Sequence, residues 1–403
     1  MSILVKITDL DLSGKTVLLR EDYNVPLKDG EVTDDTRIKA TLPTIEQLLE
    51  ADAKIILISH LGRPTPGSYD EKFSMAPVAK RLTALLGFNV PIIKDWLNGI
   101  SFEDSNIVLC ENARYEPGET QNDEALSRKM AQMCQIYIND AFATAHRAQA
   151  STHGVAKYAA ISAAGPLLIT ELKALSKALR DPAKPIVAVV GGAKVSTKLT
   201  ILESLSEKVD QLIVGGGIAN TFLKAAGYEI GNSLYESDLV DVAKRLMDSA
   251  KAKGCEIPLP IDVVCGKQFD EGTSATTKLI NEIENDDMIM DVGSETSTLL
   301  HQYIKDAATI VWNGPLGVFE FEQFSQGTEK LATAIAMGNA YSIAGGGDTI
   351  AAISKFNIAK DISYISTGGG AFIEFLEGKK LTAIEIIEEA AIAWAAMEQS
   401  REL

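Results

Sequence analysis

Residues 186–198, Ile-Val-Ala-Val-Val-Gly-Gly-Ala-Lys-Val-Ser-Thr-Lys, decide the expected fold. The first five are apolar and mostly β-branched, which is typical of a fully buried parallel strand. Gly191 and Gly192 end the strand, and Lys194 and Lys198 follow four residues apart, where we expect a helix to begin. On a helix, this spacing would place both ammonium groups on one face.

A strand, a glycine turn and a helix start with two cations suit a phosphate group. Glycines let the backbone approach an anion, and a helix N-terminus offers N–H groups. An ordinary tight turn with solvated lysines fits the same residues equally well. The remainder of the chain must therefore decide between the two interpretations.

The composition limits the classes of protein that this chain can belong to. The 403 residues allow two or three domains, and 46% apolar with 23% charged residues is ordinary for a globular protein. A net charge of −17 argues against binding to nucleic acids or anionic membranes, so an anionic substrate would need a local positive island. The four cysteines lack metal or disulfide spacing. Without a signal-peptide run or a membrane-length apolar stretch, we expect a soluble cytoplasmic protein.

Short β-rich runs alternate with helical patterns along the whole chain. In the first half, strands are predicted at 16–20, 55–59, 107–109 and 136–139. In the second half, they are predicted at 186–190, 211–214, 288–291, 309–312, 342–344 and 364–366. This alternation indicates parallel sheets with helices on both faces, and so many strands indicate two α/β domains.

The two halves differ in the residues that follow their strands. Charged residues follow in the first half, at 20–24, 60–64, 111–114 and 140–147, whereas glycines follow in the second, at 191–192, 215–217, 345–347 and 368–370. Ligands of open α/β sheets lie outside the carboxyl ends of the strands. We therefore expect a basic pocket in the first domain and a backbone-lined pocket in the second.

Two further helices are predicted from periodicity. Leu172, Leu175 and Leu179 indicate a helix at 170–180 that joins the domains, although a routine surface helix has the same pattern. The tail at 381–403 also has a helical pattern. Thr382 and Glu385 form a capping-box sequence there, and the apolar face comprises Ile384, Ile387, Ala391 and Trp394.

Short motifs separate the possible kinds of nucleotide site. A dinucleotide fingerprint starting at Gly215 would need a third glycine at position 220, where Asn220 stands, so a dehydrogenase is disfavoured. The run Gly345–Thr349 instead combines a glycine turn with Asp348, an acid that suits Mg²⁺ or a helix N-cap.

A basic cluster is expected at the strand ends of the first domain, because planar guanidinium groups suit carboxylate and phosphate oxygens. Asp22 and Asn24 lie nearby in sequence and suit a substrate hydroxyl. The cluster comprises Arg20, Arg37, His60, Arg63, Arg114, His146 and Arg147.

Seven motifs, spread over residues 20–371, together closely resemble the signatures of the phosphoglycerate kinase family. They are REDYNVPL at 20–27, SHLGRP at 59–64, DAFATAHR at 140–147, GGAKV at 191–195, WNGPLGVFE at 312–320, GGGDT at 345–349 and STGGGA at 366–371. The resemblance implies two Rossmann-like, three-layer αβα domains joined by a hinge helix, with the C-terminal helix returning to the N-terminal domain.

The resemblance also implies the activity and the domain bounds. The reaction would be reversible, Mg²⁺-dependent phosphoryl transfer from 1,3-bisphosphoglycerate to ADP, giving 3-phosphoglycerate and ATP in glycolysis or gluconeogenesis. Residues 1–170 with 384–403 would bind phosphoglycerate, 171–182 would form the interdomain helix, and 183–383 would bind the nucleotide. The cations come from both halves, so domain closure would complete the site and exclude water. A monomer is expected.

Residue roles are implied position by position. The substrate residues would be Asp22, Tyr23, Asn24, Arg37, His60, Leu61, Gly62, Arg63, Arg114 and Arg147. The nucleotide residues would be Lys198, Gly293, Asn313, Glu320, Gly346, Gly347, Asp348 and Thr349, with Asp348 also at the metal. Arg37, Lys194 and Lys198 would be catalytic.

Two positions depart from the family pattern, and one alternative function remains. Ala143 stands where many members have glycine, and Ser294 stands where proline is common. A non-catalytic acidic binding protein on the same fold is the alternative. The presence of Arg37, Lys194 and Asp348 argues against that alternative.

Overall fold

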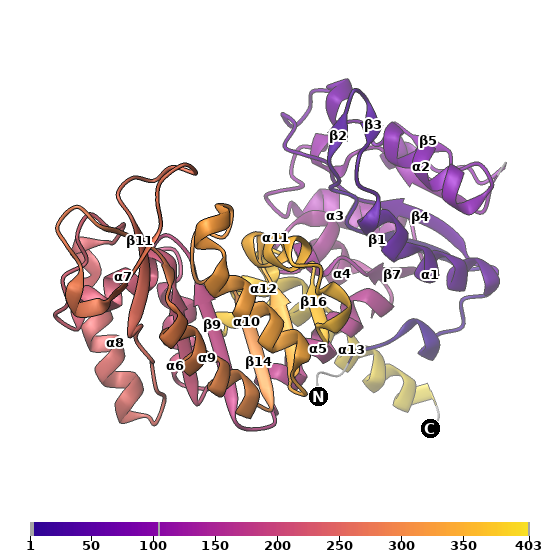
Figure 1. Ribbon diagram of the computed structural model, residues 1–403. Helices are drawn as coiled ribbons and strands as arrows, with labels where there is room; N and C mark the ends of the chain where they lie inside the picture. Colours follow the sequence, from indigo (N-terminus) through magenta and orange to yellow (C-terminus); the bar gives the residue numbers. More distant parts are fainter. Residues whose placement is uncertain (1–3, 104, 402–403) are drawn as a thin grey trace. The chain divides into compact units, whose positions relative to one another are not determined.

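The computed structural model describes residues 4–103 and 105–401, which divide into two units (Figure 1). Unit 1 comprises Met1–Leu172 and Lys380–Leu403, and unit 2 comprises Lys173–Lys379. Helix α5 (Pro166–Leu179) begins in unit 1 and ends in unit 2. It starts four residues before the helix predicted at 170–180.

Unit 1 is built on a six-stranded parallel sheet with the order β5-β6-β4-β1-β7-β8. Its strands are β1 (Thr16–Arg20), β4 (Lys54–Ile58), β5 (Ile92–Ile93), β6 (Ile107–Cys110), β7 (Ile136–Asn139) and β8 (Ser162–Ala164). A small hairpin, β2 (Leu27–Lys28) and β3 (Glu31–Val32), follows β1. The four strands predicted in this half are confirmed, whereas β5 and β8 were not predicted.

Helices cover both faces of this sheet. Val17 and Leu19 of β1 share a core with Ile45 of helix α1 (Thr36–Glu50), whereas Leu18 points to the opposite face and is also fully buried. The helices of unit 1 are α1 (Thr36–Glu50), α2 (Ala76–Leu86), α3 (Glu124–Gln132) and α4 (Val155–Tyr158). The arrangement is the predicted parallel α/β layer structure.

The last helix, α13 (Thr382–Arg401), packs on unit 1, against α4, β8 and the short π-helix η6 (Ala150–Gly154). Ile387 and Ala391 are buried there, and Trp394 packs against the unit 1 core. The predicted return of the C-terminal helix is therefore confirmed. The predicted capping box is wrong, because the helix already begins at Thr382, whose buried hydroxyl bonds to no described residue.

Unit 2 is built on a five-stranded parallel sheet with the order β10-β9-β14-β15-β16. Its strands are β9 (Ile186–Gly191), β10 (Gln211–Gly215), β14 (Thr309–Asn313), β15 (Tyr341–Gly345) and β16 (Tyr364–Ser366). Its helices are α6 (Leu199–Ser206), α7 (Gly216–Ala225), α8 (Val240–Ala252), α9 (Ser294–Asp306), α10 (Gln326–Met337), α11 (Gly347–Lys355) and α12 (Gly370–Leu376).

One predicted strand of unit 2 lies in a different sheet. Strand β13 (Met288–Val292) pairs antiparallel with β11 (Asp262–Gly266), which also pairs with β12 (Thr276–Leu279). The prediction that 288–291 belongs to a parallel sheet is therefore wrong. An apolar run indicates a buried strand but carries no information about the direction of its partner.

The turn after β9 also differs from the prediction. Helix α6 begins at Leu199, so Lys194 and Lys198 both lie before it. The shared helical face expected from their spacing does not exist. Instead, Lys198 occupies the N-cap position, and its backbone carbonyl accepts the hydrogen bond from the Leu202 N–H.

Within the described ranges 4–103 and 105–401, no helix combines the length and the apolar character needed to cross a membrane.

Candidate functional site

The carboxyl ends of the unit 1 strands carry a linked set of polar groups. Arg37 donates from Nη1 to the Asp22 carboxylate at 2.6 Å and to the Asn24 carbonyl at 3.2 Å. The Asn24 side chain accepts from the Gly62 N–H at 2.9 Å, and Arg114 donates to the Gly62 carbonyl. Residues that follow β1, β4 and β6 are thus joined with the first turn of α1.

His60 lies buried in the centre of this set. Its Nδ1 is 3.1 Å from Nη2 of the fully buried Arg20. Arginine can only donate, so Nδ1 is the acceptor and the ring proton sits on Nε2. Burial, and then the charges of Arg20, Arg114, Arg147 and Arg37, hold the pKa of His60 well below its usual value. The imidazole is therefore neutral, with one donor for a ligand.

Arginines crowd around this neutral histidine. Burial first, and then Arg147, Arg20 and Arg63, lower the pKa of Arg114 to about 10. Arg63 is exposed, and Arg147 is half-buried with its Nε donating to His146 Nε2 at 3.1 Å. The structure therefore brings together the basic residues that the sequence predicted, and the cluster suits an anion with several oxygens.

Two expected substrate residues have side chains that point into the core. Tyr23 is fully buried, and its hydroxyl lies 3.1 Å from Thr41 Oγ1. Leu61 is 4% exposed and belongs to the apolar core of unit 1. Only backbone atoms of these residues can serve a ligand, and the Tyr23 N–H already donates to Ser59 Oγ at 2.8 Å.

Unit 2 contains a cavity of about 260 Å³ at the carboxyl ends of its parallel strands. Glycine backbone, apolar side chains and two acids form its walls. They are Gly192, Ala193, Gly216, Gly217, Asn220, Leu234, Phe269, Met288, Ile289, Met290, Pro315, Gly317, Val318, Glu320 and Asp348. Such a mixture suits a flat apolar group joined to a polar one.

The turn after β15 is held in a fixed conformation beside this cavity. The Asn313 amide donates to the Gly345 carbonyl at 2.7 Å, and Lys198 Nζ donates to Asn313 Oδ1. Gly346 has φ +97°, and a Cβ there would lie 2.6 Å from Asn313 Nδ2, so only glycine fits. The Thr349 hydroxyl accepts from the Gly314 N–H at 2.8 Å.

Helix α11 begins at Gly347 and directs its N-terminus toward this region, with Asp348 in its first turn. Asp348 is exposed and lines the cavity. Desolvation lowers the pKa of Lys198, whereas the nearby Asp348 and Glu377 carboxylates oppose that shift. Two charges of opposite sign therefore face the same helix start, which suits a phosphate that carries a metal ion.

The other expected nucleotide residues lie at varied places in unit 2. Glu320 is an exposed residue of the cavity wall, and Gly347 is exposed at the start of α11. Gly293 is buried directly before α9, and its N–H donates to the Asp262 carbonyl at 2.9 Å. It does not line the cavity. Lys194 is exposed on the turn after β9.

Several lining residues were not predicted from the sequence. Leu234 and Phe269 come from irregular segments, which have no periodic pattern. Met288 and Ile289 were predicted only as part of a strand. Asn220, considered only as a missing glycine, lines the cavity and donates to the Leu234 carbonyl at 3.1 Å. In the sequence, only the ends of the predicted strands indicated where this cavity would lie. They do not reveal which distant segments complete its wall.

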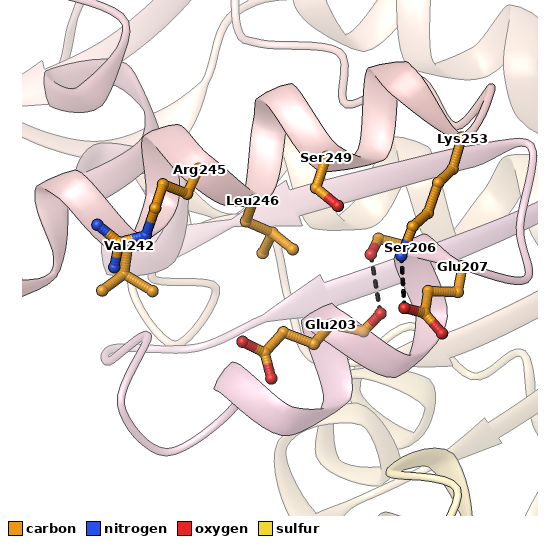
Figure 2. A pocket seen from close by; sticks show the side chains of 8 residues that line it. All are labelled: Glu203, Ser206, Glu207, Val242, Arg245, Leu246, Ser249 and Lys253. Carbon is orange, nitrogen blue, oxygen red and sulfur yellow. Dashed lines mark hydrogen bonds and ion pairs between the residues drawn. The ribbon is translucent and has the colours of Figure 1, made fainter.

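A second hollow lies on the helical surface of unit 2, between α6 and α8 (Figure 2). It measures about 340 Å³, and an ion pair of 2.6 Å between Lys253 and Glu207 closes one end. Glu207 directly follows α6 and precedes β10, so this hollow lies at the amino ends of the strands. Ligands of such sheets bind at the opposite edge.

A group of three acids elsewhere in unit 2 could also attract a cation. Glu284, Asp286 and Asp287 have carboxylate oxygens within 4.8 Å of one another. However, Lys267 contacts all three acids, and Lys278 contacts Glu284 and Asp287. These two lysines offset most of the negative charge of the three acids.

A guanidinium cluster in one α/β unit and a glycine-lined cavity at a helix start in another are typical of a nucleotide-dependent phosphotransferase. Comparison with known proteins specifies the family. The phosphoglycerate kinase family model matches residues 7–379. The chain belongs to the phosphoglycerate kinase family, kinases that use ATP or ADP and transfer phosphate to a carboxyl group.

Individual relatives agree with this assignment. A phosphoglycerate kinase of Nitratidesulfovibrio vulgaris (strain DSM 19637 / Miyazaki F) is 58% identical over 386 residues, which cover 96% of this chain and 98% of the relative. The structure of phosphoglycerate kinase from Coxiella burnetii matches with a TM-score of 0.94 and 53% identity, covering 96% of this chain and all of that one. The crystal structure of phosphoglycerate kinase from Pyrococcus horikoshii OT3 matches with a TM-score of 0.79 and 32% identity. This match covers 97% of this chain and 100% of that one.

Proposed function

We propose that unit 1 binds 3-phosphoglycerate or 1,3-bisphosphoglycerate and that unit 2 binds ADP or ATP. The observation that carries this proposal is the arginine cluster around the neutral His60, because a protein of net charge −17 otherwise repels a multiply charged anion. The chain would catalyse the reversible transfer of a phosphoryl group between the acyl phosphate and ADP. We expect it to act as a monomer in the cytoplasm, within glycolysis or gluconeogenesis.

In unit 1, Arg63, Arg114 and Arg147 would hold the non-transferring phosphate and the carboxylate of the substrate. Their planar groups can donate two hydrogen bonds to one anion. Asp22 and Asn24 would fix the substrate hydroxyl, and His60 would donate from Nε2. The backbone around Tyr23, Leu61 and Gly62 completes the wall, since two of these residues have buried side chains and the third has none.

In unit 2, the α11 N-terminus and Lys198 would hold the nucleotide phosphates. The N–H groups of the first turn, from Gly347 onward, and the positive end of the helix dipole favour an anion there. Glu320, on the cavity wall, would accept hydrogen bonds from the ribose. Asn313, Gly346 and Thr349 would act by keeping the turn in shape, as their mutual contacts indicate.

Asp348 fits a magnesium ion, because it is an exposed carboxylate beside the expected phosphate position. Mg²⁺ is commonly bound by one or two carboxylates together with substrate phosphates, and it neutralises charge on the phosphate oxygens. Arg37, Lys194 and Lys198 would stabilise the phosphoryl group during transfer. Phosphoryl transfer needs positioning and positive charge more than covalent help.

The activity test is a coupled assay for Mg²⁺-dependent consumption of ATP that requires 3-phosphoglycerate. Calorimetric titration of each ligand separately then tests the assignment of the two units. Arg147→Ala should weaken binding of 3-phosphoglycerate about 10-fold or more and leave Mg-ADP binding intact. Asp348→Asn should have the opposite pattern.

Each variant has a matched control in the same unit. Arg128→Ala removes an exposed arginine that pairs with Glu124 at 2.8 Å, away from the cluster. Asp306→Asn removes an exposed acid at the end of α9. Both controls should bind both ligands normally. Loss of Mg-ADP binding in Arg147→Ala, with 3-phosphoglycerate binding retained, would contradict the assignment.

A further inference from the structure

The turn that carries Lys194 is tied to a distant acid. Glu236 accepts two hydrogen bonds from Ser196, from its N–H at 2.8 Å and from its hydroxyl at 2.6 Å. Ser196 lies two residues after Lys194, and Glu236 lies 40 residues further along the chain. Desolvation alone would raise the pKa of Glu236, but the hydrogen bonds from Ser196, the charge of Lys194 and the Val195 backbone together hold it below its usual value.

Further contacts connect Glu236 with α7. The Glu236 N–H donates to Thr221 Oγ1 at 3.2 Å, and the Thr221 hydroxyl donates to the Gly217 carbonyl at 2.9 Å. A Cβ at Gly217 would lie 2.2 Å from the Ala193 carbonyl oxygen. The start of α7 therefore presses directly against the residue that precedes Lys194.

Contacts within the turn complete this arrangement. The Thr197 hydroxyl donates to the Lys194 carbonyl at 2.9 Å, and the Lys198 N–H donates to the Val195 carbonyl at the same distance. The turn is thus attached on one side to α7 and on the other to Glu236. No regular helix supports Lys194 itself, because α6 begins only at Leu199.

We propose that Glu236 is a positioning residue that holds the Lys194 turn in its catalytic conformation through its paired hydrogen bonds to Ser196. This inference rests on the proposed role of Lys194 at the transferring phosphoryl group. A carboxylate can accept both bonds from Ser196 at once, one on each oxygen, whereas an amide has a single acceptor oxygen. The position of Lys194 along the turn then depends on an acid that lies outside the nucleotide contacts.

Steady-state kinetics on a set of variants tests this role. Glu236→Ala should lower kcat by about 10- to 100-fold, since small misplacement of a catalytic group has effects of that size. The KM values of both substrates should stay within about threefold, because the contacts to the ground-state ligands remain. The kcat of Glu236→Gln should lie between those of wild type and Glu236→Ala, because the single amide oxygen can keep one of the two hydrogen bonds from Ser196.

A matched control and a double-mutant cycle separate positioning from a general structural effect. Glu229→Gln removes an exposed acid of the same segment, paired with Lys224 at 3.0 Å, and should keep wild-type kcat. If Glu236 acts through Lys194, adding Glu236→Ala to Lys194→Ala should change kcat by less than about threefold. Ser196→Ala supplies a second route, since it removes the hydroxyl donor and leaves the carboxylate in place.

The outcomes are distinct. If Glu236→Ala kept the wild-type kcat while Lys194→Ala lowered it, this inference would be overturned and the proposed role of Lys194 would stand. A full kcat for Lys194→Ala would overturn the role of Lys194 and this inference with it. An equal loss from Glu236→Ala with and without Lys194 would also overturn it, as would a loss of Mg-ADP affinity that matches the loss of kcat. Should Glu236→Ala fail to fold, Glu236→Gln and Ser196→Ala carry the same comparisons.

Discussion

Arg37 donates a hydrogen bond from Nη1 to Asp22 Oδ2 at 2.6 Å, within the basic cluster of unit 1. The Asp22 side chain is only 12% exposed, whereas that of Arg37 is 38% exposed and can also face a ligand. The acid therefore has two effects on an anionic ligand. It orients the arginine, and it also adds a repulsive charge.

Replacing Asp22 with Asn should separate this repulsion from the proposed contact between Asp22 and the substrate hydroxyl. Inorganic sulfate should bind more tightly, because one negative charge has left the pocket. We expect 3-phosphoglycerate to bind about 10-fold more weakly, because its hydroxyl loses a charged acceptor, a contact of about 1.5–3 kcal/mol. Inhibition by sulfate and the KM for 3-phosphoglycerate measure both changes. A parallel change in both would show that Asp22 does not contact the hydroxyl.

Sulfate should compete with 3-phosphoglycerate and not with ATP. The cluster of Arg63, Arg114 and Arg147 offers it several donors, and a partly exposed cluster on an acidic protein is sensitive to screening by salt. Sodium chloride at matched ionic strength is the control, and it should raise the KM for 3-phosphoglycerate less than sulfate does. Competition of sulfate with ATP alone would contradict the assignment of the basic cluster.

Gly346→Ala should destabilise unit 2 and abolish nucleotide binding. The new alanine would have to adopt a φ of +97°. Its Cβ would lie 2.6 Å from Asn313 Nδ2, the amide nitrogen that donates to the Gly345 carbonyl. Strain of this kind costs about 1–3 kcal/mol. Gly347→Ala is the matched control for stability, because a Cβ at Gly347 would have no heavy atom within 4 Å and its φ is not positive. Urea unfolding of both variants measures the difference.

The stability of unit 2 should depend on pH through Asp291. Burial raises the pKa of this carboxyl to about 7. The Gly327 N–H, which donates to it at 2.7 Å, partly opposes this rise. Since the folded pKa lies above the unfolded value of about 3.9, the group favours the folded state at low pH. That contribution is lost as the pH rises from about 4 to about 7.

Asp291→Asn removes this titration and should therefore gain stability relative to wild type as the pH rises. The measurement is the urea midpoint of both proteins at pH 5.5 and at pH 8. The difference between mutant and wild type should shift in favour of the mutant at the higher pH. A difference that does not change with pH would show that Asp291 keeps one charge state over this range.

Deleting residues 382–403 should destabilise unit 1 and weaken binding of 3-phosphoglycerate. Helix α13 buries Ile384 and Ile387, and a buried isoleucine contributes about 1.5–3 kcal/mol. The Ala383 N–H also donates to the Ala145 carbonyl at 3.0 Å, two residues before Arg147. Mg-ADP affinity should remain within about threefold, because every expected nucleotide contact lies in unit 2.

Calorimetry with each ligand checks this prediction, alongside Ile392→Ala as a control. Ile392 is on the same helix but is 60% exposed, so its truncation should leave stability and both affinities unchanged. If the truncated protein bound 3-phosphoglycerate normally and lost Mg-ADP, the helix would support the nucleotide site instead.

The sequence alone determined the parts of this protein that depend on neighbouring residues. Strand β9 follows from five consecutive apolar residues, and the glycine turn after β15 follows from three glycines. Arg63, Arg114 and Arg147 follow strands that were themselves predicted from the sequence. Because the carboxyl ends of parallel strands share one edge of a sheet, these residues were predictable as a group.

The tertiary structure decided everything that depends on contacts between distant segments. The direction of β13, the covering of the cavity by Leu234 and Phe269, and the start of α6 after Lys198 were not predictable from local patterns. Ser196 and Glu236 show the reason most clearly. Their pairing joins residues 40 positions apart, and neither belongs to a periodic run. Hydrophobic periodicity reports which face of an element is buried, but the partner of a polar side chain is determined only when the chain has folded.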